Sequence, residues 1–199
     1  MKLIEREEIL GLAGYEAIRE QFRTRVIAEK KARRITLGPM ASCIFENRDT
    51  ALMQIQEMLR TERITREASI LHEMETYNQL VPRDHELSAT VFIEVEEKAD
   101  REKFLFEAKG LDRAFSLVVD GTVCKGKHDE ARENPDRTTA VHYLKFPLEP
   151  AAEAALRAVL TKAKKAADVT VELVVEHPRY SARTTLPASL VLSLAEDLA

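Results

Sequence analysis

The sequence predicts an α+β fold, in which a helical N-terminal half packs with a mainly antiparallel β-sheet in the C-terminal half. Before Pro82, apolar residues recur three or four positions apart, as they do along one face of an α-helix. After Pro82 they mostly alternate with polar residues, which is typical of strands with one buried face. Asp120-Gly121 stands between two alternating runs and predicts a tight hairpin, which joins antiparallel strands.

The change of pattern at Pro82 divides the chain into a helical region with one strand, residues 1–82, and a β-rich region with helices, residues 83–199. A length of 199 residues suits two such units or one continuous domain. Apolar residues make up 45% of the chain and charged residues 32%, which indicates a folded globule. No apolar run approaches the roughly 20 residues of a membrane span. The acidic N-terminus is unlike a secretory signal, so we expect a cytoplasmic protein without a membrane partner.

Three helices and one interrupted strand are expected in the first region. A helix over residues 14–34 carries an apolar stripe formed by Tyr15, Ile18, Phe22 and Val26. The segment 35–46 alternates on both sides of Gly38-Pro39 and predicts a strand. The polar residues at 47–50 can begin a helix over 50–62, and Thr65 can cap another over 66–80.

The second region is expected to hold six strands and three helices. The strands are predicted over residues 87–96, 115–119, 122–125, 138–146, 169–176 and 180–185. The helices are predicted from Asp100 to Gly110, over 151–165, and from Pro187 onward. A charged loop is expected over 128–137.

Local charge offers one candidate nucleic-acid interface. The net charge of −4 gives no overall field that would attract nucleic acid. Residues 19–34, however, hold seven Arg and Lys residues against two Glu residues, so this helix could contact phosphates. The alternative is a solvated helix face, because Glu29 can pair with Arg33 four residues later.

Polar residues are densest between Glu46 and Asn78, and this segment is the candidate ligand-binding site. Its start joins a strand to a helix, where free backbone N–H groups can hold an anion. The candidate ligand-binding residues are Glu46, Arg48, Asp49, Gln54, Arg60, Tyr77 and Asn78. The alternative interpretation of Arg48 and Asp49 is a helix cap with a neighbouring ion pair. The catalytic motifs of the common cofactor-binding and hydrolase classes are absent from the sequence, and whether the protein is an enzyme stays open.

A transition-metal site is a second hypothesis for the same segment. Glu57 lies on one predicted helix, and His72 and Glu75 share the polar face of the next one. If these two faces met, the three side chains could bind a metal as carboxylate and imidazole ligands do inside helix bundles. Both faces could equally be solvated.

Several segments in order along the chain are similar to a bacterial family known as domain of unknown function 3501. The first runs from Phe45 to Thr50 and continues with Gln54 to Arg60 and Glu62. The others are Tyr77-Asn78 with Pro82, Glu86 to Thr90, Tyr143 to Leu148, and His177-Pro178 with Tyr180. The resemblance leads us to expect a histidine after Gly38-Pro39, but the residue there is Met40. This difference weakens the case for a metal ligand at that position.

The resemblance brings no catalytic residue and implies only a context. Genes of the family often lie beside genes for rubrerythrin and for an iron–sulfur oxidoreductase of the heterodisulfide-reductase type. The resemblance therefore implies an accessory or partner protein in peroxide defence or electron transfer, with rubrerythrin-like or iron–sulfur partners. The alternatives are a metal-dependent enzyme that uses residues 46–78 and a nucleic-acid-binding protein that uses helix 19–34. A homo-oligomer is compatible with each of these.

Overall fold

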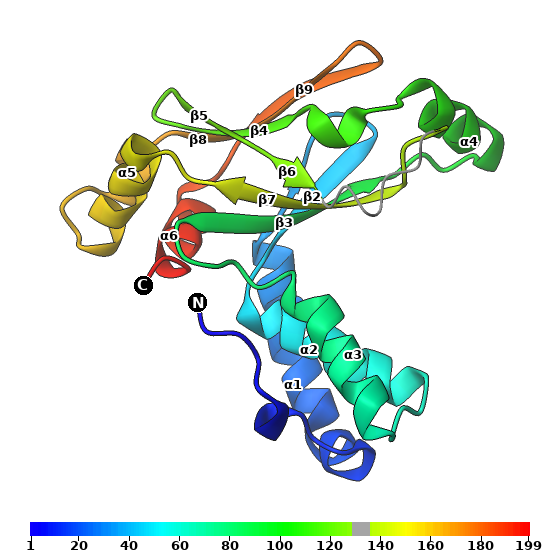
Figure 1. Ribbon diagram of the computed structural model, residues 1–199. Helices are drawn as coiled ribbons and strands as arrows, with labels where there is room; N and C mark the ends of the chain where they lie inside the picture. Colours follow the sequence, from blue (N-terminus) through cyan, green and yellow to red (C-terminus); the bar gives the residue numbers. More distant parts are fainter. Residues whose placement is uncertain (129–135) are drawn as a thin grey trace.

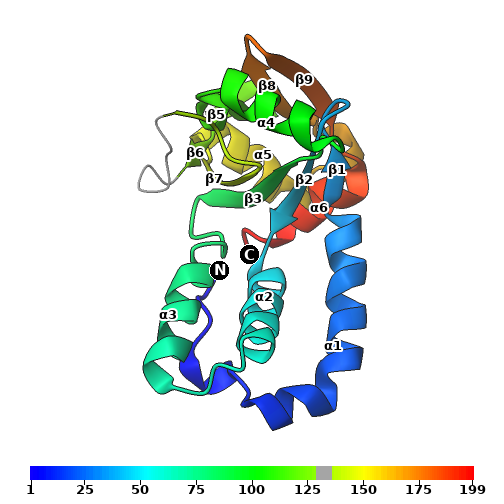
Figure 2. The ribbon, with the colours of Figure 1, turned by 90° about the vertical axis from the view of Figure 1, so that its right-hand side faces the viewer.

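The computed structural model describes residues 1–128 and 136–199, and it confirms an α+β fold with two lobes (Figure 1). The helical lobe contains α1 (Leu12–Ala32), α2 (Arg48–Thr61) and α3 (Glu67–Asn78), preceded by the 3₁₀ helix η1 (Arg6–Glu8). Figure 2 shows these helices extending away from the sheets. The β lobe contains the strands and the remaining helices.

Two antiparallel sheets make up the β lobe. Sheet A has the order β1 (Arg34–Thr36), β2 (Ala41–Glu46), β3 (Glu86–Ile93), β7 (Val141–Pro147) and β6 (Lys127–His128). Sheet B has the order β5 (Thr122–Lys125), β4 (Phe115–Val119), β8 (Val171–His177) and β9 (Tyr180–Thr185). The described neighbours in both sheets pair antiparallel, as the hairpin signals predict. Asp120 and Gly121 both have positive φ, of 46° and 83°, which the tight turn between β4 and β5 requires.

One apolar core joins the two sheets to the helices α5 (Pro150–Leu160) and α6 (Ala188–Glu196). Leu117, Leu144, Leu173 and Leu194 are fully or almost fully buried in it. A second, smaller core holds the helical lobe together through Ile55, Leu59, Ile70 and Met74, which recur at helical spacing on α2 and α3. The alternation of side chains along β7 determines which face of the strand is buried, because Leu144 and Phe146 enter the larger core while Tyr143 and Lys145 do not.

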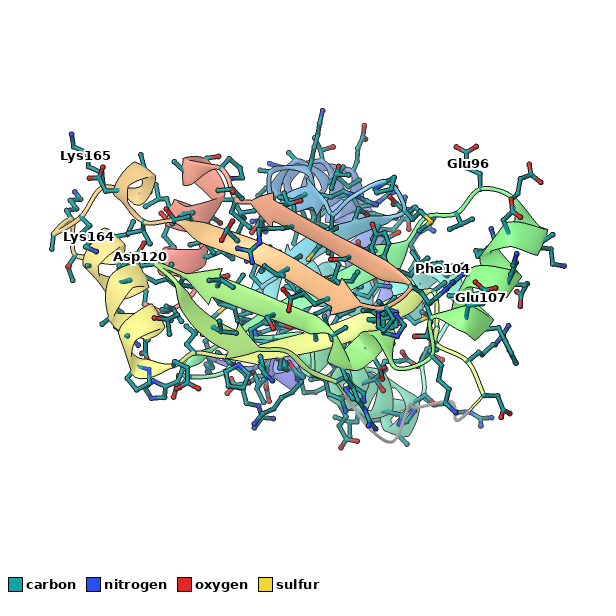
Figure 3. The ribbon with its side chains drawn as sticks, turned by 90° about the horizontal axis from the view of Figure 1, so that it is seen from above. Glu96, Phe104, Glu107, Asp120, Lys164 and Lys165 are labelled. Atoms are coloured by element: carbon teal, nitrogen blue, oxygen red, sulfur yellow. The ribbon has the colours of Figure 1, made fainter. Side chains whose placement is uncertain are left out.

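Helix α4 (Lys98–Glu107) and the hairpin turn at Asp120 lie at opposite ends of sheet B, as Figure 3 shows from above. At one end, the Phe104 ring meets Tyr180 edge-on at 5.9 Å, and Glu107 pairs with Arg179. At the other end, Asp120 accepts a hydrogen bond from the backbone of residue 170 and lies 3.3 Å from Lys164. These contacts fasten the connections that enter and leave sheet B.

The N-terminal region contributes strands to the β lobe. Strand β2 pairs with β3 over six residues, so the segment 34–46 belongs to sheet A although it precedes residue 82. The division into regions 1–82 and 83–199, as two units or one continuous domain, stays a prediction. Among the described residues, every helix is too short or too polar to serve as a membrane span.

Several predicted bounds differ from the structure for local reasons. The segment 35–46 forms two strands, because Gly38 (φ +67°) turns the chain and packs so closely that a Cβ there would lie 2.7 Å from the Tyr180 hydroxyl. The helix predicted over 151–165 ends at Leu160, and Lys162 then takes a positive φ of 61°. Strand β7 begins at Val141, not at residue 138. Most of the predicted loop 128–137 lies outside the described residues.

Candidate functional site

A pocket of about 570 Å³ opens between the C-terminal end of α3 and the side of sheet A that faces the helical lobe. Its size falls within the range of small-molecule sites. Its walls are formed by the last turn of α3 with the loop after it, by strands β3 and β7, and by the edge strand β6. The lining residues are Thr76, Tyr77, Gln79, Leu80, Arg83, Glu86, Ser88, Lys127, His128, Tyr143, Leu144, Lys145 and Pro147.

Lys145 is the most constrained charged group in this pocket. Its side chain is 26% exposed, and its Nζ lies 3.1 Å from Glu86 Oε1. The same Nζ donates to the backbone carbonyl of Val81 at 2.8 Å. Burial lowers the pKa of Lys145, and the Glu86 carboxylate opposes that change. A lysine with a lowered pKa in a pocket is a candidate functional group.

Two further cations lie at the edges of the pocket. Arg83 follows α3, and its backbone N–H donates to Glu86 Oε1 at 2.9 Å, which fixes the loop. Lys127 on β6 stands directly opposite Lys145 in the sheet register. Both Arg83 and Lys127 are exposed, and neither side chain forms an ion pair with another residue in the described part of the chain. Among the described lining residues there are therefore three Arg and Lys side chains and one carboxylate.

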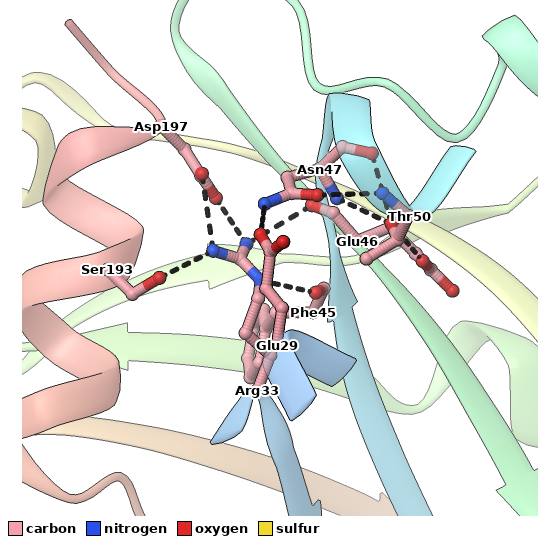
Figure 4. Close-up of polar contacts among 8 residues, drawn as sticks. All are labelled: Glu29, Arg33, Phe45, Glu46, Asn47, Thr50, Ser193 and Asp197. Carbon is pink, nitrogen blue, oxygen red and sulfur yellow. Dashed lines mark hydrogen bonds and ion pairs between the residues drawn. The ribbon is translucent and has the colours of Figure 1, made fainter. Parts of the chain in front are cut away.

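A separate polar network is buried where α1 meets sheet A and α6 (Figure 4). Arg33 is 1% exposed, yet each of its five N–H groups has an acceptor. Nε donates to Phe45 O at 2.7 Å, and Nη1 to Ser193 Oγ at 2.7 Å. The remaining three reach Glu46 O and both carboxylate oxygens of Asp197. Burial raises the pKa of Asp197 to about 6, and Arg33 opposes that change.

Glu46 belongs to the same network and is also buried. Its carboxylate accepts hydrogen bonds from Thr50 Oγ1 at 2.5 Å and from Thr90 Oγ1 at 2.7 Å. Asn47 caps α2, because its side chain accepts from the Thr50 N–H at 3.0 Å, and its amide nitrogen donates to Glu29. The polar groups of the network are hydrogen-bonded to one another, and they join α1, β2, α2 and α6. We therefore interpret the network as structural.

A third polar feature lies in the core between the sheets. His142 on β7 is 4% exposed, and its Nε2 has no hydrogen-bond partner among residues 1–128 and 136–199. Burial lowers the pKa of His142 to about 4, and the neighbouring Asp112 opposes that change. His128 Nε2 lies 3.0 Å from Asp112 Oδ2. The neutral His142 ring is therefore part of the core at neutral pH.

The structure does not gather the seven predicted ligand-binding residues into one cavity. Arg48 binds Glu8 and the backbone carbonyl of residue 2, Asp49 binds Arg25, and Arg60 lies 2.7 Å from Glu16. These three ion pairs fasten α2 to α1 and to the N-terminal segment.

The other four predicted residues also lie apart from one another. Asn78 holds the backbone of Ile4 with two hydrogen bonds, of 2.9 and 3.0 Å. Gln54 is half-buried on α2, and Glu46 is enclosed in the buried network. Of the seven, all in the described part of the chain, Tyr77 lines the pocket.

The three residues of the predicted metal site are not brought together either. Glu57 faces α1, where it accepts from the Tyr15 hydroxyl at 2.7 Å and from Arg19 Nε at 2.8 Å. His72 and Glu75 are exposed on α3. Within residues 1–128 and 136–199, no group of three or more His, Cys, Asp or Glu side chains has an arrangement that could hold a metal ion. Glu57 is bound to α1, whereas His72 and Glu75 are exposed on α3, so the three side chains lie apart.

The basic stretch 19–34 is largely paired within the molecule. Arg19 binds Glu57, Arg25 binds Asp49, and Arg33 is buried. Arg34 binds Glu94 and lies over the Phe92 ring. The helix therefore presents fewer unpaired cations than its sequence suggests.

The sequence interpretation did not identify Arg83, Lys127 and Lys145 as site residues. One signal was present, because the alternation of 141–147 places Lys145 on the face opposite to Leu144 and Phe146. The missing information was the position of α3, which turns that face of the sheet into a pocket wall.

Comparisons with known proteins found a matching family model and a similar crystal structure. The model of a family described as "Protein of unknown function (DUF3501)" matches residues 3–198. A crystal structure of a novel protein of unknown function from Burkholderia pseudomallei is similar over 100% of both chains, with 32% sequence identity and a TM-score of 0.88. None of the curated proteins matches the chain.

Proposed function

The chain belongs to the DUF3501 family of proteins of unknown function, and we propose that it is a small-molecule-binding accessory protein. The observation that carries this proposal is the pocket of about 570 Å³ between α3 and sheet A. Its walls combine apolar and aromatic side chains with a few convergent charged groups, which is the usual composition of a ligand site.

The position of the pocket suits a binding role. It lies where the helical lobe meets the β lobe, and ligand sites occur preferentially at such junctions. Its charged groups come from four segments, namely the loop after α3 and the strands β3, β7 and β6. A bound molecule would therefore contact both lobes and stabilise their relative arrangement.

We further propose that the accessory role is in peroxide defence or electron transfer, with a rubrerythrin-like or iron–sulfur protein as partner. The gene context that the family resemblance implies supports this proposal. The internal pairing of the arginines in residues 19–34 makes it preferable to a nucleic-acid-binding role. Co-purification from cells that express the tagged protein tests it, and the absence of both partner types from the purified complex would count against it.

Ligand binding can be tested with two matched threonine variants. Thr76 lines the pocket, and its hydroxyl donates to the backbone carbonyl four residues earlier at 2.9 Å. Thr24 on α1 makes the same local bond at 2.8 Å, far along the chain from the pocket. We expect Thr76→Trp to fill the pocket and Thr24→Trp to leave it open.

The measurement is ligand-observed NMR with a library of small polar and aromatic compounds. We expect compounds that bind the wild-type protein to bind Thr24→Trp equally and to lose binding to Thr76→Trp. The proposal is contradicted if the compounds bind both variants equally well, because binding would then not use the pocket.

A further inference from the structure

We infer that the pocket recognises a small organic anion, whose acidic group lies between Lys127, Lys145 and Arg83. Its apolar or planar body would lie against the aromatic side chains of the same pocket. This inference rests on the proposed function, because it specifies the ligand class of that pocket.

The sheet register provides the first argument. Lys127 and Lys145 are direct partners across the antiparallel pair of β6 and β7. Directly opposite residues of such a pair have Cβ atoms about 5 Å apart, and like charges there are destabilising. A ligand anion between the two ammonium groups would convert this repulsion into attraction.

The balance of charge in the pocket provides the second argument. Glu86 is the one carboxylate among the lining residues, and its Oε1 already lies 3.1 Å from Lys145 Nζ. Lys127 and Arg83 therefore have no carboxylate partner among the lining residues. Arg83 lies close enough to Lys145 to contribute to the lowering of its pKa. The described lining residues therefore carry more positive than negative charge, which favours an anion.

The uncharged lining indicates what the rest of the ligand resembles. Leu80 and Pro147 provide apolar surface, and Tyr77 and Tyr143 provide two aromatic rings. Tyr143 is 38% exposed, so part of its ring remains accessible. Aromatic rings favour contact with flat or apolar groups. The combination fits an aromatic or unsaturated carboxylate or phosphate ester better than an inorganic ion.

The inference is tested by isothermal titration with four probes: phenyl phosphate, benzoate, inorganic phosphate and the neutral compound benzyl alcohol. We expect phenyl phosphate and benzoate to bind more tightly than inorganic phosphate, which lacks the planar body. Benzyl alcohol should bind most weakly, because it lacks the charge. Affinity for phenyl phosphate should fall as salt is added, since Lys127 and Arg83 are exposed.

Charge-removing variants identify the groups responsible. Lys127→Gln and Arg83→Gln should each weaken phenyl phosphate binding by about twofold to fivefold, as expected for exposed charges. The matched control is Lys125→Gln, because Lys125 is an exposed lysine on β5 of sheet B and does not line the pocket. It removes the same charge and should leave the affinity unchanged.

The outcomes separate this inference from the proposed function. The inference is overturned if benzyl alcohol binds as tightly as phenyl phosphate, if none of the three anionic probes binds, or if all three variants behave alike. Binding of the neutral probe that Thr76→Trp abolishes would leave the proposed function intact. Binding of any probe that Thr76→Trp does not affect would overturn the proposed function as well.

Discussion

Replacing Arg33 by methionine should destabilise the protein strongly, because Arg33 is buried and bonded at all five of its N–H groups. The variant keeps a long apolar side chain but leaves the Asp197 carboxylate buried without its ion-pair partner. Removing one partner of a buried ion pair costs roughly 3–5 kcal/mol. We therefore expect a loss of about 4 kcal/mol in the free energy of unfolding, measured by urea denaturation at neutral pH.

The neighbouring residue supplies the control. Arg34 also forms an ion pair, with Glu94, but that pair is exposed, so Arg34→Met should cost no more than about 1 kcal/mol. The double variant Arg33→Met/Asp197→Leu removes both buried charges and should be more stable than Arg33→Met alone. The reasoning is refuted if Arg33→Met costs less than about 1.5 kcal/mol, or if the second substitution only adds to the loss.

Three further perturbations test other parts of the structure. The folded-state pKa of His142 is about 4 against 6.5 when unperturbed, so His142 contributes stability above pH 6.5 that is lost as the pH falls toward 4. Asp197 has the opposite effect on stability, since its pKa is raised. The histidine contribution, about 3 kcal/mol at most, is therefore isolated by subtracting the free energy of unfolding of His142→Phe from that of the wild type at each pH. The same pH dependence in both proteins would contradict this prediction. Gly38→Ala should lower the free energy of unfolding by more than about 1 kcal/mol and Gly11→Ala by less than about 0.5 kcal/mol. The reason is that, of these two positions, a Cβ would clash at Gly38 and not at Gly11. Equal effects in thermal denaturation would disprove this. Asn78→Ala should cost about 1–3 kcal/mol in the same assay for two lost hydrogen bonds, and a neutral result would show that the N-terminal segment is held otherwise.

Periodicity predicted the architecture because each long element carries its own pattern of burial. The alternation of β8 depends on neighbours two positions apart, so it is visible in the sequence. The stripe predicted on α1 is only partly buried, because Tyr15 and Val26 are buried whereas Ile18 is 45% exposed. The chain break at Gly38 was visible in the sequence. The close approach of Tyr180, which leaves too little space for a Cβ at Gly38, was not. That approach joins residues more than a hundred positions apart.

The site was predicted less well, because the partners of charged residues are not encoded locally. Glu57 has the sequence spacing of a possible ligand, yet Arg19 and Tyr15 on α1 bind it. The alternation of its strand places Lys145 on the face away from the larger core, but it does not show that α3 makes that face a pocket wall. Position in a helix or strand follows from periodicity, whereas the polar partners depend on how the elements pack.

The bond between Arg33 and Asp197 also constrains when the protein can finish folding. The two residues are 164 positions apart, so during synthesis the guanidinium group emerges long before its carboxylate partner. The helical lobe has a core of its own, formed by residues between positions 4 and 81, so its helices can pack before α6 is made. The pair of Arg33 and Asp197 can close only after α6 has been made, and we expect this late step to fix the end of α1 against α6.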